Sequence, residues 1–450
     1  MTLTDKELEF IKQNIDISPD RLSLNKRRPE GVDFSLCLKC IEGNRKMRKK
    51  VPLWANKLSL IYPYPLSLEQ CSSQPTAQYK ATIVSSLLNS SLPDKSSVCS
   101  RDSAHGLIAD ITGGMGVDSY FLSKEADGLL YMERDETLCA AAENNFASLD
   151  ANNITVANTT STAESVKNEI KVFASRYGRD KVDIIYADPA RRGKNNSKVI
   201  MLEDYEPDIL SLNSNLLDLA GYLLVKVSPM ADIKLYLQKL QGVTNVYIVS
   251  VDNECKELLF LMRAGSHTEP DDLPVTVACI DSKSILADAG GVDEFTFTYR
   301  QEDSAHAEYQ TKEATLPKYL YEPDKAVLKA AAFKLTGTCF GLKKIAPSTH
   351  LYCGDSIVDF PGKRFTVIEE FDFGKKAFKE IAKRYPAASV TSKNLPVDSN
   401  QLKKMLRVDE SNDIHIFAFT DADGCKKIYI TTPTDHSLSS KPNEQNICIV

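Results

Sequence analysis

The sequence lacks any apolar run that approaches the roughly 18 residues expected of a membrane-spanning helix. Its first residues, Met1–Glu7, have none of the apolar core of a secretory signal peptide. Histidine is scarce: there are six, none paired at metal-ligand spacing, which argues against a metal centre or a histidine-based catalytic triad. We therefore expect a cytoplasmic protein with no metal and no membrane partner.

The cysteines also exclude a disulfide framework. There are eleven, an odd number, scattered along the chain and often inside apolar runs. That usage is typical of reduced intracellular thiols. Cys37 and Cys40 form one C-x-x-C pair, but a structural zinc site needs two further ligands, and the sequence has no second pair of this kind. No zinc site is predicted.

The charge distribution is more informative than the net charge of −6. Residues 26–50 hold nine Lys and Arg against three Asp and Glu, and residues 360–407 hold eleven against five. Local basic surfaces can bind phosphates even on an acidic protein. Two solvated helix faces would explain the same pattern, so the charges alone leave both interpretations open.

A glycine-rich turn lies in residues 109–118, which read ADITGGMGVD. Asp110 is predicted to end a β-strand, and three glycines then turn the chain into a helix: Gly113, Gly114 and Gly116. Such a turn lets backbone N–H groups approach a ligand at a helix N-terminus. The dinucleotide fingerprint G-x-G-x-x-G is not met, because Ser119 stands where its third glycine belongs.

An acidic residue follows the next predicted strand. Gly128–Met132 has the apolar character of a buried strand, and Glu133 and Arg134 come directly after it. An acid about 20 residues beyond a glycine turn is positioned to accept hydrogen bonds from both ribose hydroxyls. Glu133 is the best candidate for that role, and the turn and this acid together predict a nucleotide-like cofactor.

The glycine turn resembles motif I of the class I S-adenosylmethionine (SAM) methyltransferases, an acidic residue followed by G-x-G-x-G. Asp110, Thr112, Gly114 and Gly116 occupy those places, with Thr112 replacing the first glycine. The resemblance implies SAM as the cofactor. It also implies that the polar residue after the third strand, Asn158 of Ile154–Asn158 or its neighbour Thr159, faces the adenine; a turn or helix-cap role is the alternative.

The fourth predicted strand, Val182–Ala187, precedes the sequence Asp188-Pro-Ala-Arg-Arg-Gly. This resembles motif IV of methyltransferases that act on nucleic acids, Asp/Asn-Pro-Pro followed by an aromatic residue or an arginine. The resemblance implies that Asp188, with Pro189, orients the acceptor or takes its proton. The aromatic residue of adenine-N6 enzymes is replaced by Arg191, and Arg191 and Arg192 suggest contact with phosphate or carboxylate.

Strand and helix patterns alternate from about residue 100 to 265, which predicts a parallel sheet with covered faces. The last two strands are predicted to be joined by a short turn over 252–257, as in the antiparallel end of a methyltransferase sheet. Pyrimidine-C5 methyltransferases need a cysteine after the fifth strand, where this chain has Ser228-Pro-Met. Cys255 is more simply a buried thiol, so direct transfer to nitrogen or oxygen is favoured.

The whole chain resembles a bacterial family, typical of Bacteroidetes, with a class I SAM-dependent methyltransferase domain followed by ferredoxin-like and THUMP-like domains. Four segments carry the resemblance: Asp188-Pro-Ala-Arg-Arg, Val227-Ser-Pro-Met, Asn253-Glu-Cys-Lys-Glu-Leu-Leu and Tyr319-Leu-Tyr-Glu-Pro. The fold class implied is α/β: a Rossmann-like seven-stranded domain, a helical N-terminal region and a smaller α+β C-terminal region.

We expect five parts: a helical region over 1–95, the methyltransferase domain over 96–267, a ferredoxin-like unit over 268–318, a THUMP-like domain over 319–432 and a flexible tail over 433–450. The function implied is methyl transfer from SAM to RNA, tRNA or rRNA. Two alternatives stay open: a protein or small-molecule acceptor, and a non-catalytic SAM- or RNA-binding protein. The N-terminal region either closes over the cofactor site or only packs beside it.

Overall fold

The computed structural model describes residues 1–24, 28–90, 106–191, 205–311 and 315–434. The chain divides into two compact units. The first comprises residues 1–246, 257–268 and 283–289, and the second comprises 247–256, 269–282 and 290–450. Within the described residues, no helix is both long and apolar enough to cross a membrane.

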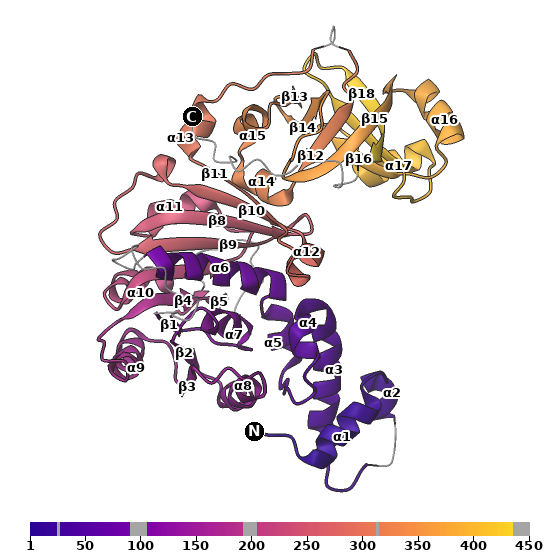
Figure 1. The fold of residues 1–450 in the computed structure, drawn as a ribbon. Helices are drawn as coiled ribbons and strands as arrows, with labels where there is room; N and C mark the ends of the chain where they lie inside the picture. Colours follow the sequence, from indigo (N-terminus) through magenta and orange to yellow (C-terminus); the bar gives the residue numbers. More distant parts are fainter. Residues whose placement is uncertain (25–27, 91–105, 192–204, 312–314, 435–450) are drawn as a thin grey trace. The chain divides into compact units, whose positions relative to one another are not determined.

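The N-terminal region of the first unit is helical, as predicted (Figure 1). Thr4 and Glu7 form a capping box that starts the first helix. Asp33 caps the third helix, and a proline opens each of the next two. The helices are α1 (Asp5–Asn14), α2 (Pro19–Ser23), α3 (Phe34–Lys50), α4 (Pro52–Ala55), α5 (Pro65–Gln70) and α6 (Gln74–Ser90).

The first unit holds most of a nine-stranded mixed sheet with the strand order β11-β10-β8-β9-β7-β4-β1-β2-β3. Every pairing from β7 to β3 is parallel, and β9 runs antiparallel to β7. The central strands are apolar and buried because both faces are covered. The strands are β1 (Leu107–Asp110), β2 (Gly128–Glu133), β3 (Ile154–Asn158), β4 (Val182–Ala187), β7 (Ala220–Val227), β8 (Val243–Val251) and β9 (Glu254–Arg263).

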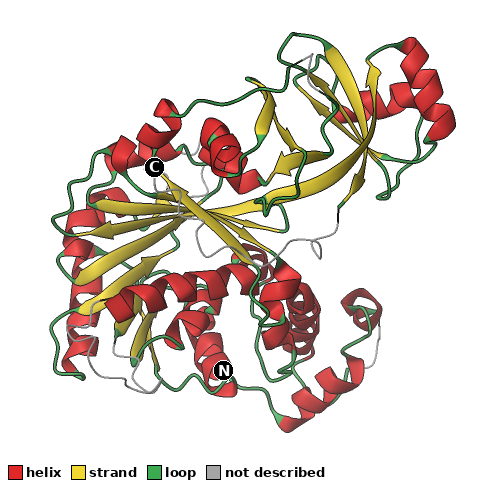
Figure 2. Ribbon diagram, turned by 45° about the horizontal axis from the view of Figure 1, so that its top comes forward, coloured by secondary structure: helices red, strands yellow, loops and turns green. Residues whose placement is uncertain are grey.

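Helices lie on both faces of this sheet, so the first unit has three layers (Figure 2). Most connect successive parallel strands, and side chains cap several of them: Asp135 starts α8, Thr162 starts α9 and Asp232 starts α11. The helices are α7 (Val117–Ser123), α8 (Glu136–Ser148), α9 (Ala163–Ser175), α10 (Ile209–Leu217) and α11 (Ile233–Lys239). The Rossmann-like expectation is therefore confirmed.

The turn between β8 and β9 is tighter than predicted. It consists of Asp252 and Asn253 alone, both with positive φ (51° and 63°), the conformation of a type I′ hairpin turn. Cys255 therefore lies in β9 rather than in a loop between the strands, which corrects the expected span of 252–257. The strand extends further because Asn and Asp tolerate the left-handed conformation that the short turn needs.

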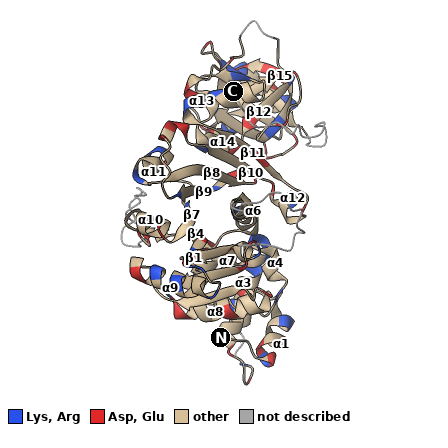
Figure 3. Cartoon of the chain, turned by 60° about the vertical axis from the view of Figure 1, so that its left-hand side comes forward, with Lys and Arg blue, Asp and Glu red and all other residues tan. Residues whose placement is uncertain are grey.

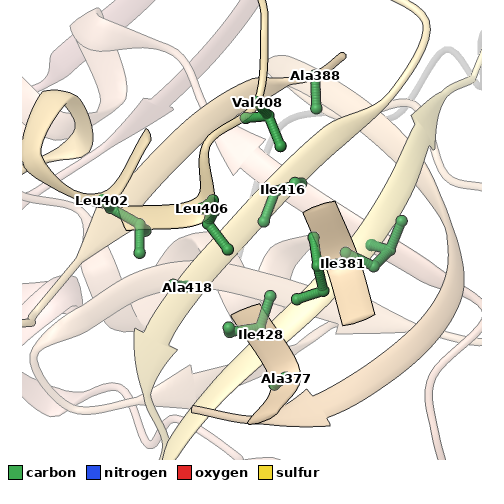
Figure 4. Close-up of a cluster of buried hydrophobic side chains, with 10 residues drawn as sticks. Ala377, Ile381, Ala388, Leu402, Leu406, Val408, Ile416, Ala418 and Ile428 are labelled. Carbon is green, nitrogen blue, oxygen red and sulfur yellow. The ribbon is translucent and has the colours of Figure 1, made fainter. Parts of the chain in front are cut away.

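The second unit contains β10 (Val275–Ile280) and β11 (Val292–Phe297), an antiparallel pair that continues the nine-stranded sheet beyond β8. It also contains a seven-stranded sheet of order β13-β14-β12-β15-β18-β17-β16. Two helices, α16 (Lys375–Arg384) and α17 (Ser399–Leu406), pack on part of the seven-stranded sheet through an apolar core that includes Ile381, Leu402 and Ile416 (Figure 4). The strands are β12 (Tyr319–Pro323), β13 (Lys343–Ala346), β14 (Thr349–Gly354), β15 (Gly362–Asp372), β16 (Ser389–Lys393), β17 (His415–Thr420) and β18 (Lys426–Pro433).

In the second unit, one Ala-rich segment forms two helices instead of one. The Ala-rich segment 325–334 has the composition of a single helix, but it forms two helices, α14 (Lys325–Ala330) and the start of α15 (Phe333–Cys339). Ala331 between them has a left-handed φ of 59°, which ends the first helix. The other helices of this unit are α13 (Tyr299–Ser304), α16 (Lys375–Arg384) and α17 (Ser399–Leu406), and α12 (Ser282–Leu286) belongs almost entirely to the first unit.

Candidate active site

The glycine turn joins β1 to α7 in the way its sequence predicts. Gly114 and Gly116 have φ values of 56° and 82°, which side-chain-bearing residues rarely adopt. Gly113 is needed for a different reason: a Cβ there would lie 2.2 Å from the ring of Tyr131. The phenol of Tyr131 donates a hydrogen bond to the carbonyl of Gly114 (2.6 Å), which fixes the turn against β2.

Asp110, the last residue of β1, is 1% exposed, and its carboxylate accepts hydrogen bonds from residues of the glycine turn and of α7. Its Oδ1 accepts hydrogen bonds from the backbone N–H (2.9 Å) and the hydroxyl (3.2 Å) of Thr112. Its Oδ2 accepts one from the hydroxyl of Ser119 (2.5 Å). Burial raises the pKa of Asp110 to about 7, although these hydrogen bonds act in the opposite direction.

Asp110 should therefore make the protein less stable as the pH rises. Its pKa in the fold, about 7, exceeds its ordinary value of 3.8, so the folded chain binds more protons between these two values. Its stabilising contribution is complete below pH 3.8 and is lost as the pH passes 7. At about 1.4 kcal/mol per pKa unit, the loss is about 4 to 5 kcal/mol.

Chemical unfolding between pH 5 and 8 measures this effect. The Asp110→Asn variant should lose that part of the pH dependence, while an Asp180→Asn change on the exposed surface should leave the pH profile as it is. Equal slopes for the wild type and Asp110→Asn would show that the carboxyl of Asp110 is ionised across this range.

Glu133, at the end of β2, faces the turn. Its Oε2 accepts a hydrogen bond from the N–H of Gly114 (2.9 Å), and its Oε1 accepts one from the N–H of Asp135 (2.9 Å). Each carboxylate oxygen has a second lone pair, so the group can still accept bonds from two ribose hydroxyls. The donor set around the turn thus fits a cofactor with a ribose.

Two other expected cofactor residues are exposed. The side chain of Asn158 donates hydrogen bonds to the backbone carbonyls of Glu133 and Arg134, both at 3.1 Å, so it ties β3 to the end of β2. Arg134 forms an ion pair with Glu206 (3.1 Å). In this structure, both side chains make contacts that support the loop beside Glu133.

Asp188 lies at the carboxyl end of β4, next to the glycine turn. Its backbone N–H donates a hydrogen bond to the hydroxyl of Thr112 (2.6 Å), which connects the motif I and motif IV segments directly. Its Oδ2 forms an ion pair with the ammonium of Lys226 on β7. The side chain of Asp188 is 32% exposed and that of Lys226 is 14% exposed, so the pair sits at the edge of the buried sheet.

Lys226 was not among the predicted site residues, although the sequence carries a signal for it. A lysine inside the apolar strand Ala220–Val227 is unusual, because buried lysines occur almost only with a charged partner. Burial by itself would lower the pKa of Lys226, but the carboxylates of Asp188, Glu257 and Asp118 outweigh it and raise that pKa. Lys226 is an ammonium at neutral pH.

A second buried lysine, Lys80 of α6, connects the N-terminal region to the sheet. Its ammonium is fully buried and lies 2.7 and 2.9 Å from the two carboxylate oxygens of Glu257 on β9. It also lies 3.2 Å from Asp118 of α7 and donates to the hydroxyl of Ser72 (3.1 Å). Asp118 in turn accepts hydrogen bonds from Ser72 (2.7 Å) and from the phenol of Tyr186 (2.8 Å).

Burial shapes the ionisation of this cluster. Burial raises the pKa of Glu257, and Lys80 and Lys226 oppose that rise. Burial acts the same way on Asp118, but there the two lysines prevail and the pKa is lowered. Through their hydrogen bonds Ser72 and Lys80 connect the N-terminal region to α7 and β9.

The arginines of motif IV are described only in part. Arg191 lies in β5 (Ala190–Arg191), which pairs with β6 (Tyr205–Glu206), while its side chain and the whole of Arg192 lie outside the described residues. Pro189 is buried. Tyr205, which could have replaced the missing aromatic residue of the motif, is only 4% exposed and is therefore poorly placed to stack on a base.

The basic segments differ in how much of their charge is paired. In α3, Lys46 pairs with Glu42 and Glu69, and Arg48 pairs with Asp16. In α16, four lysines are exposed: Lys375, Lys376, Lys379 and Lys383. Acidic and basic residues are interspersed over the rest of the chain (Figure 3). The described residues contain no group of three His, Cys, Asp or Glu side chains suited to a metal ion.

Seven adjacent strands of the nine-stranded sheet follow the order β8-β9-β7-β4-β1-β2-β3, with β9 antiparallel to β7. With a glycine turn after β1 and acids at the carboxyl ends of β2 and β4, they define a Rossmann-like methyltransferase fold. The chain is similar to a protein from Porphyromonas gingivalis W83 described as a putative methyltransferase: 30% identity, 97% of this chain and 100% of that chain covered, and a TM-score of 0.79. It belongs to the family of that protein.

Two family profiles match the C-terminal part, a ferredoxin-like domain over residues 319–361 and a THUMP domain-like module over 362–433. These bounds differ from the expected 268–318 and 319–432. The chain also resembles an rRNA methylase from Streptococcus thermophilus (14% identity, 42% of this chain and 96% of that chain, TM-score 0.28) and an O-methyltransferase from Bacillus cereus (10%, 56% and 99%, 0.31). No curated protein matches the chain in sequence.

Proposed function

We propose that the protein is a SAM-dependent methyltransferase that acts on RNA, either tRNA or rRNA. The observation that carries the proposal is the placement of Asp188. Its carboxylate is held by Lys226, and its backbone is hydrogen-bonded to Thr112 of the glycine turn. A group that can orient an acceptor is thereby fixed next to a turn suited to a nucleotide-like cofactor.

In this proposal the cofactor occupies the turn between β1 and α7. Glu133 accepts hydrogen bonds from the ribose hydroxyls, and Gly113, Gly114 and Gly116 let the backbone approach. Asp110 holds the turn through Thr112. Asn158 and Arg134 border the adenine side of the site, with Asn158 acting mainly by fixing the carbonyl groups around Glu133.

SAM, when bound, supplies a methyl group on a sulfonium, which is an activated electrophile. The protein therefore needs to bring the acceptor into line and hold it there, and alignment alone can provide about 7 to 11 kcal/mol of the barrier reduction. Asp188 orients the acceptor, Pro189 fixes the turn behind it, and Arg191 and Arg192 contact phosphate. No metal takes part in this proposal.

RNA is the proposed acceptor because phosphate-binding features recur in the chain. Four exposed lysines lie on α16, inside the segment that matches the THUMP domain-like profile. Arginine forks and lysines neutralise phosphates, and binding of that kind weakens steeply as salt is added. We also propose the domain organisation expected from the sequence, with the C-terminal bounds moved to those of the two matching profiles.

Methyl-labelled SAM and total RNA from cells that lack the protein provide the test. We expect label in one size class of RNA, and RNA binding that weakens with salt. A transfer of label to neither small nor large RNA, together with no salt-dependent binding, would overturn the proposal.

A protein or small-molecule acceptor is the second candidate. Two observations favour it: the net charge of −6 and the burial of Tyr205, which is therefore not available to stack on a base. Label recovered in protein or in small metabolites, with RNA unlabelled, would establish it.

A further inference from the structure

We infer that the methyl acceptor is a hydroxyl oxygen, the ribose 2′-hydroxyl of RNA, held between the carboxylate of Asp188 and the ammonium of Lys226. This inference rests on the proposed function and narrows it to one atom. It follows from the hydrogen-bonding capacity of the two charged groups and from their fixed position.

The two groups offer one acceptor and one donor. Oδ2 of Asp188 is taken by Lys226, while Oδ1 has no hydrogen-bond partner among the described residues and can accept one. Lys226 has three N–H donors and no acceptor. A hydroxyl matches both, because it donates its proton to Asp188, accepts from Lys226 and keeps a second lone pair for the methyl group.

An exocyclic amine does not match this pair. Its nitrogen has a single lone pair, which must attack the methyl carbon, and its two N–H groups need acceptors. An ammonium next to that nitrogen could only donate into the attacking lone pair and would block the reaction. The ion pair of Asp188 with Lys226 therefore disfavours nitrogen and favours oxygen.

The buried cluster behind the pair keeps Lys226 charged and in place. Glu257 and Asp118 are the further carboxylates whose charges stabilise the ammonium, and Lys80 holds both of them from α6. Lys80, Glu257 and Asp118 have little or no exposed side-chain surface, so they do not reach a substrate. They are positioning residues for Lys226.

The stacking geometry agrees with a ribose acceptor. An enzyme that modifies a base inside a duplex takes the base out of its stack and holds it between aromatic or apolar side chains. At the motif IV loop the nearby ring, Tyr205, is buried. The 2′-hydroxyl is both donor and acceptor and is available on every nucleotide without unstacking of its base.

Methyl transfer to the hydroxyl forms one bond and breaks one bond. A lone pair of the hydroxyl oxygen forms the new bond to the methyl carbon, and the carbon–sulfur bond breaks with its electron pair left on sulfur. The hydroxyl proton passes to Asp188, from which it is later released to water. Lys226 stays an ammonium throughout and stabilises the negative charge that develops on the oxygen.

Lys226→Met tests the pairing because it keeps the length of the side chain and removes the charge. We expect the turnover number to fall about 10² to 10³-fold, the usual loss for one donor to a developing oxyanion, with SAM affinity little changed. Lys171→Met, the same change on the exposed surface of α9, is the control. For an amine acceptor the same variant would keep or raise the activity, because Asp188 would be released.

The product of the wild-type protein gives an answer that does not depend on any variant folding. RNA labelled with methyl-labelled SAM is hydrolysed with alkali, which cannot cleave next to a 2′-O-methylated ribose. Label in alkali-stable dinucleotides supports the inference. Label in mononucleotides as a methylated base overturns it and leaves the proposed function standing, whereas unlabelled RNA overturns both.

Discussion

Asp188→Asn should abolish methyl transfer while the protein still binds SAM. The asparagine side chain has nearly the shape of aspartate, but it can neither take a proton nor pair with the ammonium of Lys226. Loss of a positioned proton acceptor lowers rates by about 10² to 10⁴-fold. We expect an effect in this range on turnover, because Asp188 combines acceptor orientation with the ion pair.

Single-turnover kinetics and calorimetric SAM titration separate the two parts of this prediction. The turnover number should collapse, and the dissociation constant for SAM should stay within about threefold, since only the backbone of Asp188 touches the turn. Asp180→Asn, on an exposed loop, controls for the substitution itself. Full activity in Asp188→Asn would remove Asp188 from the mechanism and with it the basis of the proposed site.

The sequence predicted the parts of the site that depend on local pattern. Glycines at a strand-to-helix turn, Glu133 after β2 and Asp188 after β4 follow from strand order and turn chemistry, because parallel strands bring their carboxyl ends to one edge of the sheet. Asn158 was the weaker prediction, and its amide makes the turn-supporting bonds that were the alternative reading.

The charged cluster could not be predicted in the same way. Lys80 and Glu257 are 177 residues apart in sequence, and neither belongs to a recognisable motif. Lysine in a helix or glutamate at a strand is ordinary in a sequence, and it is only their burial in the fold that makes them exceptional. Lys226 was easier to predict from the sequence, because it is a charged residue within an otherwise mostly apolar strand.

In the second unit, errors came from local backbone geometry. Ala331 is a good helix former, yet it adopts a left-handed conformation and splits the expected helix. Propensity is a weak guide there because α14 and α15 pack through different residues, Val327 in the first and Leu335 in the second, which a straight helix would place differently. The position of the hairpin turn at Asp252 was predicted correctly, but the turn is shorter than predicted.

Lys80→Met should destabilise the protein strongly. In the variant, the negative charge of the buried Glu257 would lose the ammonium that neutralises it. Removal of one partner of a buried ion pair lowers the free energy of unfolding by about 3 to 5 kcal/mol. The effect should shrink in acid, because burial raises the pKa of Glu257 and a protonated Glu257 needs no partner. A carboxyl with a raised pKa contributes its stability below its ordinary pKa of 4.5 and loses it as the pH rises through the raised value.

A double-mutant cycle decides whether the pair itself is responsible. Lys80→Met with Glu257→Leu replaces both charges by apolar groups and should recover much of the lost stability, because buried pairs are often no more stable than well-packed apolar residues. Lys46→Met, which breaks an exposed pair with Glu69, should cost less than about 1 kcal/mol in the same denaturant assay. If the double variant were as unstable as the sum of the single ones, Lys80 would act through packing or through Asp118.

Methyl transfer by the folded double variant then measures whether the cluster of Lys80, Glu257 and Asp118 serves Lys226 or only the fold. A stable double variant with a lowered turnover number would show that the cluster contributes to the reaction. A stable double variant with a normal turnover number would show that it contributes to stability alone.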